Sequence, residues 1–289
     1  MVDEVLEVLA VGEGAIFLDL TIGAAGHAVE IAGRLGTGGL LIGMDLDPEI
    51  LRVARARLED AGFENFRLYH GNFIHCRDAL EDAGVEAVDG ILLDLGVSSL
   101  QLGEPGRGFS FSRDGPLDMR MDPGGGLTAA DIVNRAGERE LARIFREYGE
   151  ERLARRIARM IVRERGKERI ETTARLARIA ERAYGRTRRR IHPATRIFQA
   201  LRIAVNRELD NLREFLNMAP ELLEQGARIA VISFHSLEDR IVKEDFRSRA
   251  REGVYNILTK KPLRPSPQEV EDNPGARSAK LRAAQRSVR

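Results

Sequence analysis

Short apolar runs and stretches of helical periodicity alternate over the first hundred residues. Short apolar runs are typical of parallel strands, since both faces of a parallel sheet are covered. These runs lie at 15–20, 40–44, 66–70 and 88–93. Between them, apolar residues recur at helical spacing over 26–35, 48–61 and 73–83. This alternation predicts an α/β fold built on a parallel, doubly wound sheet.

The apolar run 88–93 is followed by Asp94 and then by small residues. Asp94 is expected at the carboxyl end of its strand, which is the edge of an open α/β sheet where ligands bind. Gly96 and Ser98 would let a planar ligand come close to the backbone. A carboxylate in this position can also simply cap the following loop. This stretch alone does not separate the two interpretations.

A turn of small residues, 21–27, follows the first strand and begins a helix, and the second strand ends at Asp45, 19 residues beyond Gly26. Such a turn lets a cofactor approach a helix N-terminus, and a carboxylate about 20 residues further on can accept both ribose hydroxyls of a nucleoside. The turn lacks the G-x-G-x-x-G pattern that favours a dinucleotide. The pair therefore favours S-adenosylmethionine as cofactor, with a nicotinamide dinucleotide as the alternative.

The alternation stops after Ser99. Residues 101–126 form a long segment rich in Gly, Arg and Phe, typical of loops that carry function. From 128 to about 190 the apolar residues recur at helical spacing, which predicts a small helical domain with basic faces outward. A long helix is expected over 193–218, and a strand over 227–234 indicates that the sheet resumes.

The helical block is therefore expected to be an insertion. The predicted division is a first part of the sheet domain at 1–104, a loop and inserted helical domain at 105–192, and a second part of the sheet domain at 193–289. Near the end of the chain, 255–258 and 279–284 are expected to form a closing pair of antiparallel strands.

Charge is segregated along the chain although the net charge is only +1. Residues 1–134 carry 9 basic and 23 acidic side chains, whereas residues 135–190 carry 19 basic and 9 acidic ones. Residues 240–289 add 13 basic against 6 acidic side chains. Pairs of Glu and Arg along a helix absorb part of such an excess. The remainder indicates a polyanionic partner, and nucleic acid is the expected one.

The sequence does not favour a membrane protein, a secreted protein, a metalloprotein or a hydrolase. No apolar run approaches the roughly 20 residues of a membrane span, the start does not resemble a signal peptide, and a cytoplasmic location is expected. The single cysteine, Cys76, excludes an internal disulfide. None of the five histidines has metal-ligand spacing with another, so no metal is expected. Ser236 lacks the glycines of a nucleophile elbow, which disfavours a hydrolase.

Nine motifs occur in order along nearly the whole chain. They are Asp19-x-Thr-x-Gly-x-x-Gly-His27, Asp89-Gly-Ile-Leu-Leu-Asp-Leu-Gly-Val-Ser-Ser99, Arg107-Gly-Phe-Ser-Phe111, Gly115-Pro-Leu-Asp-Met-Arg-Met-Asp122, Tyr148-Gly-Glu-Glu-Arg152, His192-Pro-Ala-Thr-Arg196, Phe198-Gln-Ala-Leu-Arg202, Ser233-Phe-His-Ser-Leu-Glu-Asp-Arg240 and Ser278-Ala-Lys-Leu-Arg282. Together they resemble the RsmH (MraW) family of bacterial methyltransferases, which modify cytosine N4 in small-subunit ribosomal RNA.

The resemblance implies a class I, Rossmann-like fold dependent on S-adenosylmethionine, with an inserted all-helical domain. It implies small-subunit ribosomal RNA or the assembled small ribosomal subunit as partner. It also implies which residues contact the methyl donor: Ala25, Gly26, His27, Asp45, Phe73, Asp94 and Gln101. Position in the sequence had already indicated Gly26, Asp45 and Asp94. Phe73, just after the third strand, would be an apolar wall against the adenine, and Gln101 rests on the resemblance alone.

The chain departs from the family pattern in three places. It begins inside a segment that usually contains His-x-Pro-Val, so one wall of the site is expected to be incomplete. The turn has Ala24 and Ala25 where Gly is common. Gly275 stands where an Arg is usual, which removes one possible phosphate contact.

The expected acceptor, the cytosine amine, is a poor nucleophile because its lone pair is conjugated with the ring. Asp94 is the expected catalytic residue, because a hydrogen-bond acceptor aimed at the amine would make that lone pair available, and the carbonyls of Leu95 and Gly96 are alternatives. Candidate substrate residues are Arg107 and Arg120 for phosphates, Phe109 and Phe111 for stacking on a splayed-out base, and His235 at the same edge as Asp94.

Three other functions remain open from the sequence. One is a methyltransferase of the same fold that acts on another nucleic-acid amine. A nicotinamide-dependent oxidoreductase is a second, and a non-catalytic RNA-binding module is the third.

Overall fold

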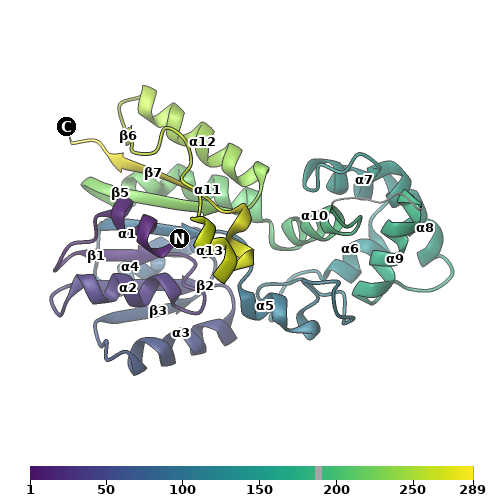
Figure 1. The fold of residues 1–289 in the computed structure, drawn as a ribbon, viewed down its shortest axis with the longest axis horizontal. Coiled ribbons are helices and arrows are strands. Elements are labelled where there is room, and N and C mark those ends of the chain that lie inside the picture. The colour runs from purple at the N-terminus through teal and green to yellow at the C-terminus, as the bar shows by residue number, and fades with distance from the viewer. Residues whose placement is uncertain (186–190, 289) are drawn as a thin grey trace. The chain divides into compact units, whose positions relative to one another are not determined.

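The structure, a computed structural model, describes residues 1–185 and 191–288 (Figure 1). The chain divides into two compact units, one formed by Met1–Gly96 with Leu209–Arg289 and the other by Val97–Glu208. The inserted unit thus extends beyond the sequence-based boundaries at 105 and 192. Its extension has a physical reason, because Ile197, Phe198 and Leu201 are buried in its core. Residues 186–190, the end of the expected helical stretch, lie outside the described residues.

One sheet of seven strands forms the centre of the first unit, in the order β3-β2-β1-β4-β5-β7-β6. The strands are β1 (Ile16–Asp19), β2 (Leu40–Asp45), β3 (Phe66–His70), β4 (Val88–Asp94), β5 (Leu223–Ser233), β6 (Tyr255–Ile257) and β7 (Lys280–Arg286). The first five are parallel, and β7 is antiparallel to both β5 and β6. The predicted doubly wound sheet and its closing antiparallel pair are confirmed, and the fold is that of the class I methyltransferases.

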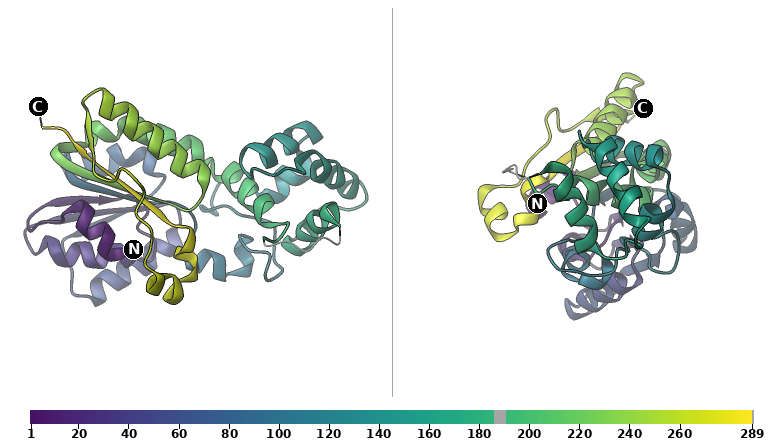
Figure 2. Two further views of the ribbon diagram at one scale, coloured as in Figure 1. Left: turned by 45° about the horizontal axis from the view of Figure 1, so that its top comes forward. Right: turned by 90° about the vertical axis from the view of Figure 1, so that its right-hand side faces the viewer.

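Helices cover both faces of this sheet (Figures 1 and 2). One layer comprises α1 (Val2–Leu9), α2 (Gly26–Leu35) and α3 (Pro48–Asp60), and the other comprises α4 (Cys76–Ala83), α11 (Glu208–Leu222) and α12 (Ser236–Arg251). Successive residues of β4 point to opposite layers: Leu92 is buried with α1–α3, whereas Ile91 and Leu93 are buried with the other layer. The apolar run therefore has two buried faces, and Asp94 lies where it ends.

The described part of the second unit is built from helices and loops around its own apolar core. Its elements are α5 (Ser99–Gly103), the 3-10 turn η2 (Pro105–Arg107), α6 (Ala129–Arg135), α7 (Glu138–Glu147), α8 (Ala154–Arg165), α9 (Thr173–Tyr184) and α10 (Thr195–Asn206). Phe145, Ile157 and Leu176 are fully buried in this core. Since α8 buries the side that carries Ile157 and Ile161, its other sides are exposed and carry Arg155, Arg156, Arg159 and Arg163.

The single helix expected over 193–218 is two helices. The first, α10, ends at Asn206, and Arg207 adopts a left-handed backbone with φ 52° before α11 begins at Glu208. Apolar residues keep their helical spacing across this break, so the pattern alone does not reveal it. The buried partners do change, because α10 contributes to the core of the second unit and α11 to that of the first.

The remaining short elements of the first unit are the 3-10 turn η1 (Phe73–His75), α13 (Pro267–Asp272) and the 3-10 turn η3 (Pro274–Ser278). Among the described residues, every helix is too short or too polar to cross a membrane.

Gly90 allows β4 to lie against β1. A Cβ added to Gly90 would lie 2.1 Å from Cε1 of the buried Phe17 ring. We expect Gly90→Ala to lower the free energy of unfolding by about 1–3 kcal/mol through overpacking, measured by urea denaturation. Gly12→Ala is the control, since its new Cβ meets no atom within 4 Å. Equal losses in the two variants would contradict this packing argument.

Candidate functional site

The turn between β1 and α2 is tied to the end of β2. The Ile22 N–H donates to the Met44 carbonyl, and the Gly23 N–H donates to Asp45 Oδ2 at 3.0 Å. Ala25 caps α2 with a left-handed backbone, φ 60° and ψ 30°. A Cβ added to Gly26 would meet no atom within 4 Å, so there is open space beside the start of α2. A ligand can therefore approach the backbone here.

Asp45 lies opposite this turn, at the end of β2. Besides its bond from Gly23, it accepts a hydrogen bond from the Asp47 N–H at 2.9 Å on Oδ1. Burial raises the pKa of Asp45 to about 6, although these backbone donors oppose the shift. Each carboxylate oxygen has a second lone pair. Asp45 can thus accept two hydroxyl groups in addition to its backbone donors.

Asp94 ends β4 and lies near His27 of α2. Asp94 Oδ2 is 3.6 Å from His27 Nδ1, too far for a hydrogen bond. Burial raises the pKa of Asp94 to about 7 and lowers the pKa of His27 to about 4. Asp94 Oδ1 and His27 Nε2 are both buried without a hydrogen-bond partner among the described residues. Buried polar atoms rarely lack partners, so a polar ligand would engage these two atoms.

Asp19 and Thr21 also belong to this group, and sequence reasoning did not select them as site residues. Asp19 is 2% exposed and its Oδ1 accepts a hydrogen bond from the Thr21 N–H at 3.2 Å. Thr21 Oγ1 in turn accepts one from the Asp94 N–H at 2.6 Å. Burial raises the pKa of Asp19 to about 8, so this carboxyl is uncharged at neutral pH. The available signal was an acidic residue at the end of a buried strand, beside Asp45 and Asp94.

Phe73 and His235 complete the candidates of the first unit. Phe73 is partly buried in η1 after β3 and packs edge to face against Phe215, with ring centroids 5.8 Å apart. His235 is the N-cap of α12, where Nδ1 accepts from the Glu238 N–H at 3.3 Å and Nε2 lies 3.2 Å from Glu238 Oε1. The ring of His235 therefore has a local structural function at the start of this helix.

Gln101 lies in the second unit. It is 4% exposed and forms a capping box at the start of α5: its side-chain oxygen accepts from the Ser98 N–H at 2.9 Å, and its own N–H donates to Ser98 Oγ at 3.1 Å. Gln101, which the family resemblance implies to contact the methyl donor, thus lies in the first turn of a helix and caps it.

All four substrate candidates in the second unit have partners within that unit. Arg107 Nη2 donates to the carbonyls of Arg120 and Met121 at 3.0 and 2.8 Å. Its guanidinium also lies 5.8 Å from the ring centre of Phe109, which is only 7% exposed. Arg120 forms a two-pronged pair with Asp118, with both N–O distances 2.8 Å. These contacts shape the loop from within.

Phe111 is partly exposed, whereas Phe109 is buried. It stacks on His192 with centroids 4.6 Å apart and an interplanar angle of 23°, and it meets Phe198 edge to face at 5.0 Å. Phe111 is thus an aromatic surface held in a fixed orientation.

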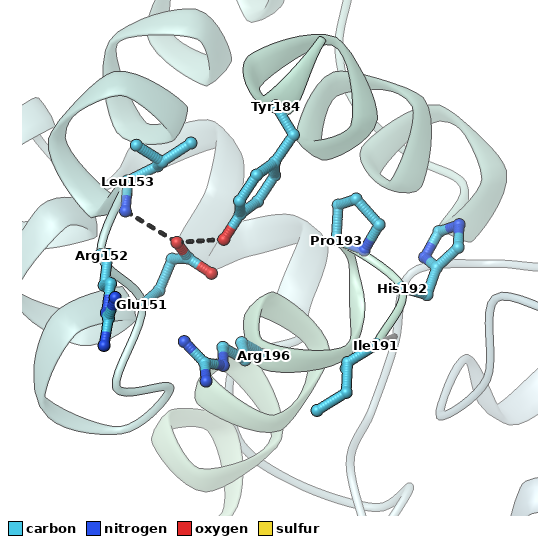
Figure 3. Close-up of a pocket in the computed structure, with 8 residues that line it drawn as sticks. All are labelled: Glu151, Arg152, Leu153, Tyr184, Ile191, His192, Pro193 and Arg196. Carbon is cyan, nitrogen blue, oxygen red and sulfur yellow. Dashed lines mark hydrogen bonds between the residues drawn. The ribbon is translucent and has the colours of Figure 1, made fainter. Parts of the chain in front are cut away.

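The second unit also contains a cavity of about 480 Å³ that the sequence did not indicate (Figure 3). The described residues that line it are Glu151, Arg152, Leu153, Tyr184, Ile191, His192, Pro193 and Arg196. Glu151 is 2% exposed, and its Oε1 accepts hydrogen bonds from the Leu153 N–H and the Tyr184 hydroxyl. Its other oxygen is directed into the cavity and has no hydrogen-bond partner among the described residues. The lining comes from three separate segments, so no single motif reveals it.

A family model described as the MraW methylase family matches residues 1–287. The chain is also similar to curated proteins named ribosomal RNA small subunit methyltransferase H. The one from Pseudothermotoga lettingae is 53% identical over 291 residues, covering 99% of this chain and 97% of that protein. The one from Koribacter versatilis is 49% identical over 292 residues, covering 98% of this chain and 91% of that protein.

The raised pKa of Asp19 makes stability depend on pH. The folded state holds this proton up to about pH 8, whereas the unfolded chain releases it near pH 4. Stability is therefore expected to fall as pH rises through that window. Asp19→Asn should remove this contribution. The free energy of unfolding of the variant minus that of wild type should therefore be a few kcal/mol larger at about pH 8 than at about pH 4. Urea denaturation across pH measures this difference. A pH-independent difference between the two proteins would contradict the assignment.

Proposed function

The chain belongs to the MraW methylase family, and from this premise we propose that it transfers a methyl group from S-adenosylmethionine to the exocyclic N4 of a cytidine in small-subunit ribosomal RNA. Relatives that share about half of the sequence over nearly its whole length carry the name ribosomal RNA small subunit methyltransferase H. The observation that carries the proposal is the open turn beside Gly26, with Asp45 and Asp94 at the adjoining strand ends.

The residues proposed to bind the methyl donor lie in the first unit, apart from Gln101. The open turn at Ala25 and Gly26 would hold the cofactor close to the backbone. Asp45 would accept the ribose hydroxyls, and Phe73 would provide an apolar surface for the adenine. Asp94 Oδ1 and His27 Nε2, buried without partners among the described residues, would bind the polar groups of the methionine part. When bound, the donor supplies a methyl group already activated by the sulfonium charge.

The residues of this chain then have two tasks in the reaction. The first is to align the acceptor nitrogen with the methyl group. The second is to accept hydrogen bonds from the N4 amine while its lone pair forms the N–C bond and the S–C bond of the donor breaks, and to take up the proton that the amine then loses. Asp94 Oδ1 is one acceptor for this purpose. If Asp94 is engaged by the methionine amino group, the carbonyls of Leu95 and Gly96 take this role.

The chain turns sharply just after Asp94. Gly96 has φ 104°, a conformation that favours glycine. The carbonyls of Leu95 and Gly96 lie beyond the end of β4 at Asp94.

The second unit is proposed to bind the RNA. Phe111 presents a ring that a splayed-out base would stack on. Arg107 and Arg120 are proposed to bind phosphates, as expected from the sequence, and they also hold the loop that carries Phe111. Asn206 of α10 anchors the same loop, since its Nδ2 donates to the Met119 carbonyl and its Oδ1 accepts from the Met121 N–H, both at 2.8 Å. Gln101 is proposed to contact the methyl donor on the basis of the family resemblance.

The direct test is methyl transfer from labelled S-adenosylmethionine to small ribosomal subunits that lack the modification. Nucleoside mass spectrometry is expected to detect N4-methylated cytidine with wild type. Asp94→Ala should lower the rate by at least about a hundredfold, because it removes a preorganised polar contact in the site. Asp60→Ala, at the exposed end of α3, is the matched control and should retain the wild-type rate. A different methylated nucleoside would establish another nucleic-acid amine as substrate, and transfer to no nucleoside would contradict the proposal.

Donor binding is expected to depend on pH through Asp94. Burial raises the pKa of Asp94 to about 7, and only its ionised form attracts a cationic ligand. The affinity for S-adenosylmethionine should therefore fall as pH decreases from 8 to 6, by up to about tenfold per unit below that pKa. Titration calorimetry of wild type and Asp94→Asn measures this dependence. The variant should bind more weakly and with a flatter pH profile, and identical profiles would refute this role for Asp94.

A further inference from the structure

Helix α8 carries a row of arginines on its solvent side. The spacing of Arg152, Arg156, Arg159 and Arg163, at intervals of four, three and four residues, places them along one side of the helix and the turn before it. All four are exposed. The opposite side is buried in the core of the second unit. We call these four residues the arginine face. From Arg156 to Arg163 it extends about 10 Å along the helix.

The arginine face has few acidic partners in the described part of the chain. Arg159 Nε lies 3.5 Å from Glu138 Oε1, between two exposed side chains, and such a pair contributes little to stability. The other three arginines have no ion pair or hydrogen bond among the described residues. On the neighbouring helices some cations are paired, as in Arg135 with Asp131, Arg143 with Glu147 and Arg182 with Glu164. Arg139 of α7 and Arg178 of α9 are exposed and have no ion pair among the described residues, but they do not form a row.

Arg165, on the same helix, has a structural role. It lies outside the arginine face, and its Nη1 donates to the carbonyls of Val133 and Ala136 at 2.8 and 2.7 Å, joining the end of α8 to α6. No member of the arginine face has a comparable contact within the described residues. The row therefore places like charges side by side without stabilising the unit, which is unfavourable unless an anion covers them.

One end of the arginine face adjoins the cavity of the second unit. Arg152 lines this cavity together with Arg196 of α10 (Figure 3). Arg196 is held in place because its Nη1 donates to the Glu150 carbonyl at 3.0 Å. Two guanidinium groups from different elements thus line one hollow at the end of the row.

We propose that the arginine face, together with Arg196, binds the phosphodiester backbone of the RNA substrate. This inference rests on the proposed function, which supplies an RNA partner. A strand of linked phosphates matches a row of guanidinium groups because each arginine can bind one phosphate through two N–H groups. Release of the counterions that surround the RNA would drive the association. The surface carries no base-specific contact, so it sets the position of the strand and not its sequence.

The test uses the full chain and a short fluorescein-labelled single-stranded RNA, with binding followed by fluorescence anisotropy over a range of salt concentrations. In Arg156→Gln/Arg163→Gln, two phosphate contacts are lost. The slope of log affinity against log salt should then decrease in magnitude by about 1.4, at roughly 0.7 for each contact. The affinity at about 0.1 M salt should fall by about tenfold or more. Arg156→Lys/Arg163→Lys keeps the charges and should keep most of the slope.

The matched control is Arg139→Gln/Arg178→Gln, which removes two exposed arginines that also lack ion pairs among the described residues but lie on α7 and α9. It should retain the wild-type slope. Equal losses in the control and the α8 pair would mean that only overall charge matters, and an unchanged slope in Arg156→Gln/Arg163→Gln would mean that α8 does not contact RNA. Either result overturns the proposal.

Two further measurements separate the possible failures. Binding of S-adenosylmethionine is titrated in the same preparations. If wild type does not bind S-adenosylmethionine, the proposed function fails. If it does bind, but the glutamine substitutions in α8 leave the RNA affinity unchanged, only the inference about the arginine face is overturned. In methyl transfer to small ribosomal subunits, the glutamine pair should raise KM for the particle by about tenfold, as expected for a lost binding contact. An unchanged KM would count against the arginine face.

Discussion

Three carboxyl groups lie at one edge of the sheet, Asp19 buried and Asp45 and Asp94 partly buried, and the geometry of the candidate site depends on their hydrogen bonds and protonation. Asp19, Asp45 and Asp94 end β1, β2 and β4, the strands on either side of the point where the winding reverses. Burying a charge without a partner is costly. The pKa values of all three are raised, and Asp19 and Asp45 accept backbone N–H groups from the turn or from the start of α3.

The same hydrogen bonds that accommodate these carboxyls also build the turn. Thr21 connects Asp19 to the backbone of Asp94, and Gly23 connects the turn to Asp45. Asp94 Oδ1 is left without a partner among the described residues. A cationic ligand placed beside it would favour its ionised form. This electrostatic arrangement would favour the sulfonium compound proposed above as the methyl donor.

Much of the first unit could be predicted from the sequence because its strands are short, buried on both faces and separated by helices. Asp45 and Asp94 could be selected because the position of a residue at a strand end fixes which edge of the sheet it reaches. Asp19 satisfied the same criterion, but its buried state could not be known before its neighbours were. The break at Arg207 was missed because helical spacing continues through it.

Side-chain partners in the second unit could not be predicted in the same way. Arg107, Phe109 and Arg120 were chosen for their chemistry, but their internal partners are fourteen or fewer residues away in a loop whose path no periodicity describes. The cavity around Glu151 needs α8, α9 and α10 to meet, a tertiary arrangement that the sequence does not encode locally. The arginines of α8 are the reverse case. Their spacing is visible in the sequence, but only the fold shows that Arg159 alone among the four has an acidic partner within the described residues.

The most direct test of the central claim, that the carboxyl cluster binds a cationic methyl donor, is titration calorimetry of the wild-type chain near pH 7 in two buffers with different enthalpies of ionisation. S-adenosylmethionine should bind at one site and release protons, because Asp94 is partly protonated in the free protein and ionised beside the donor. The observed enthalpy would then differ between the buffers, and a nicotinamide dinucleotide should not bind. Absence of binding by S-adenosylmethionine, or binding without proton release, would contradict the account.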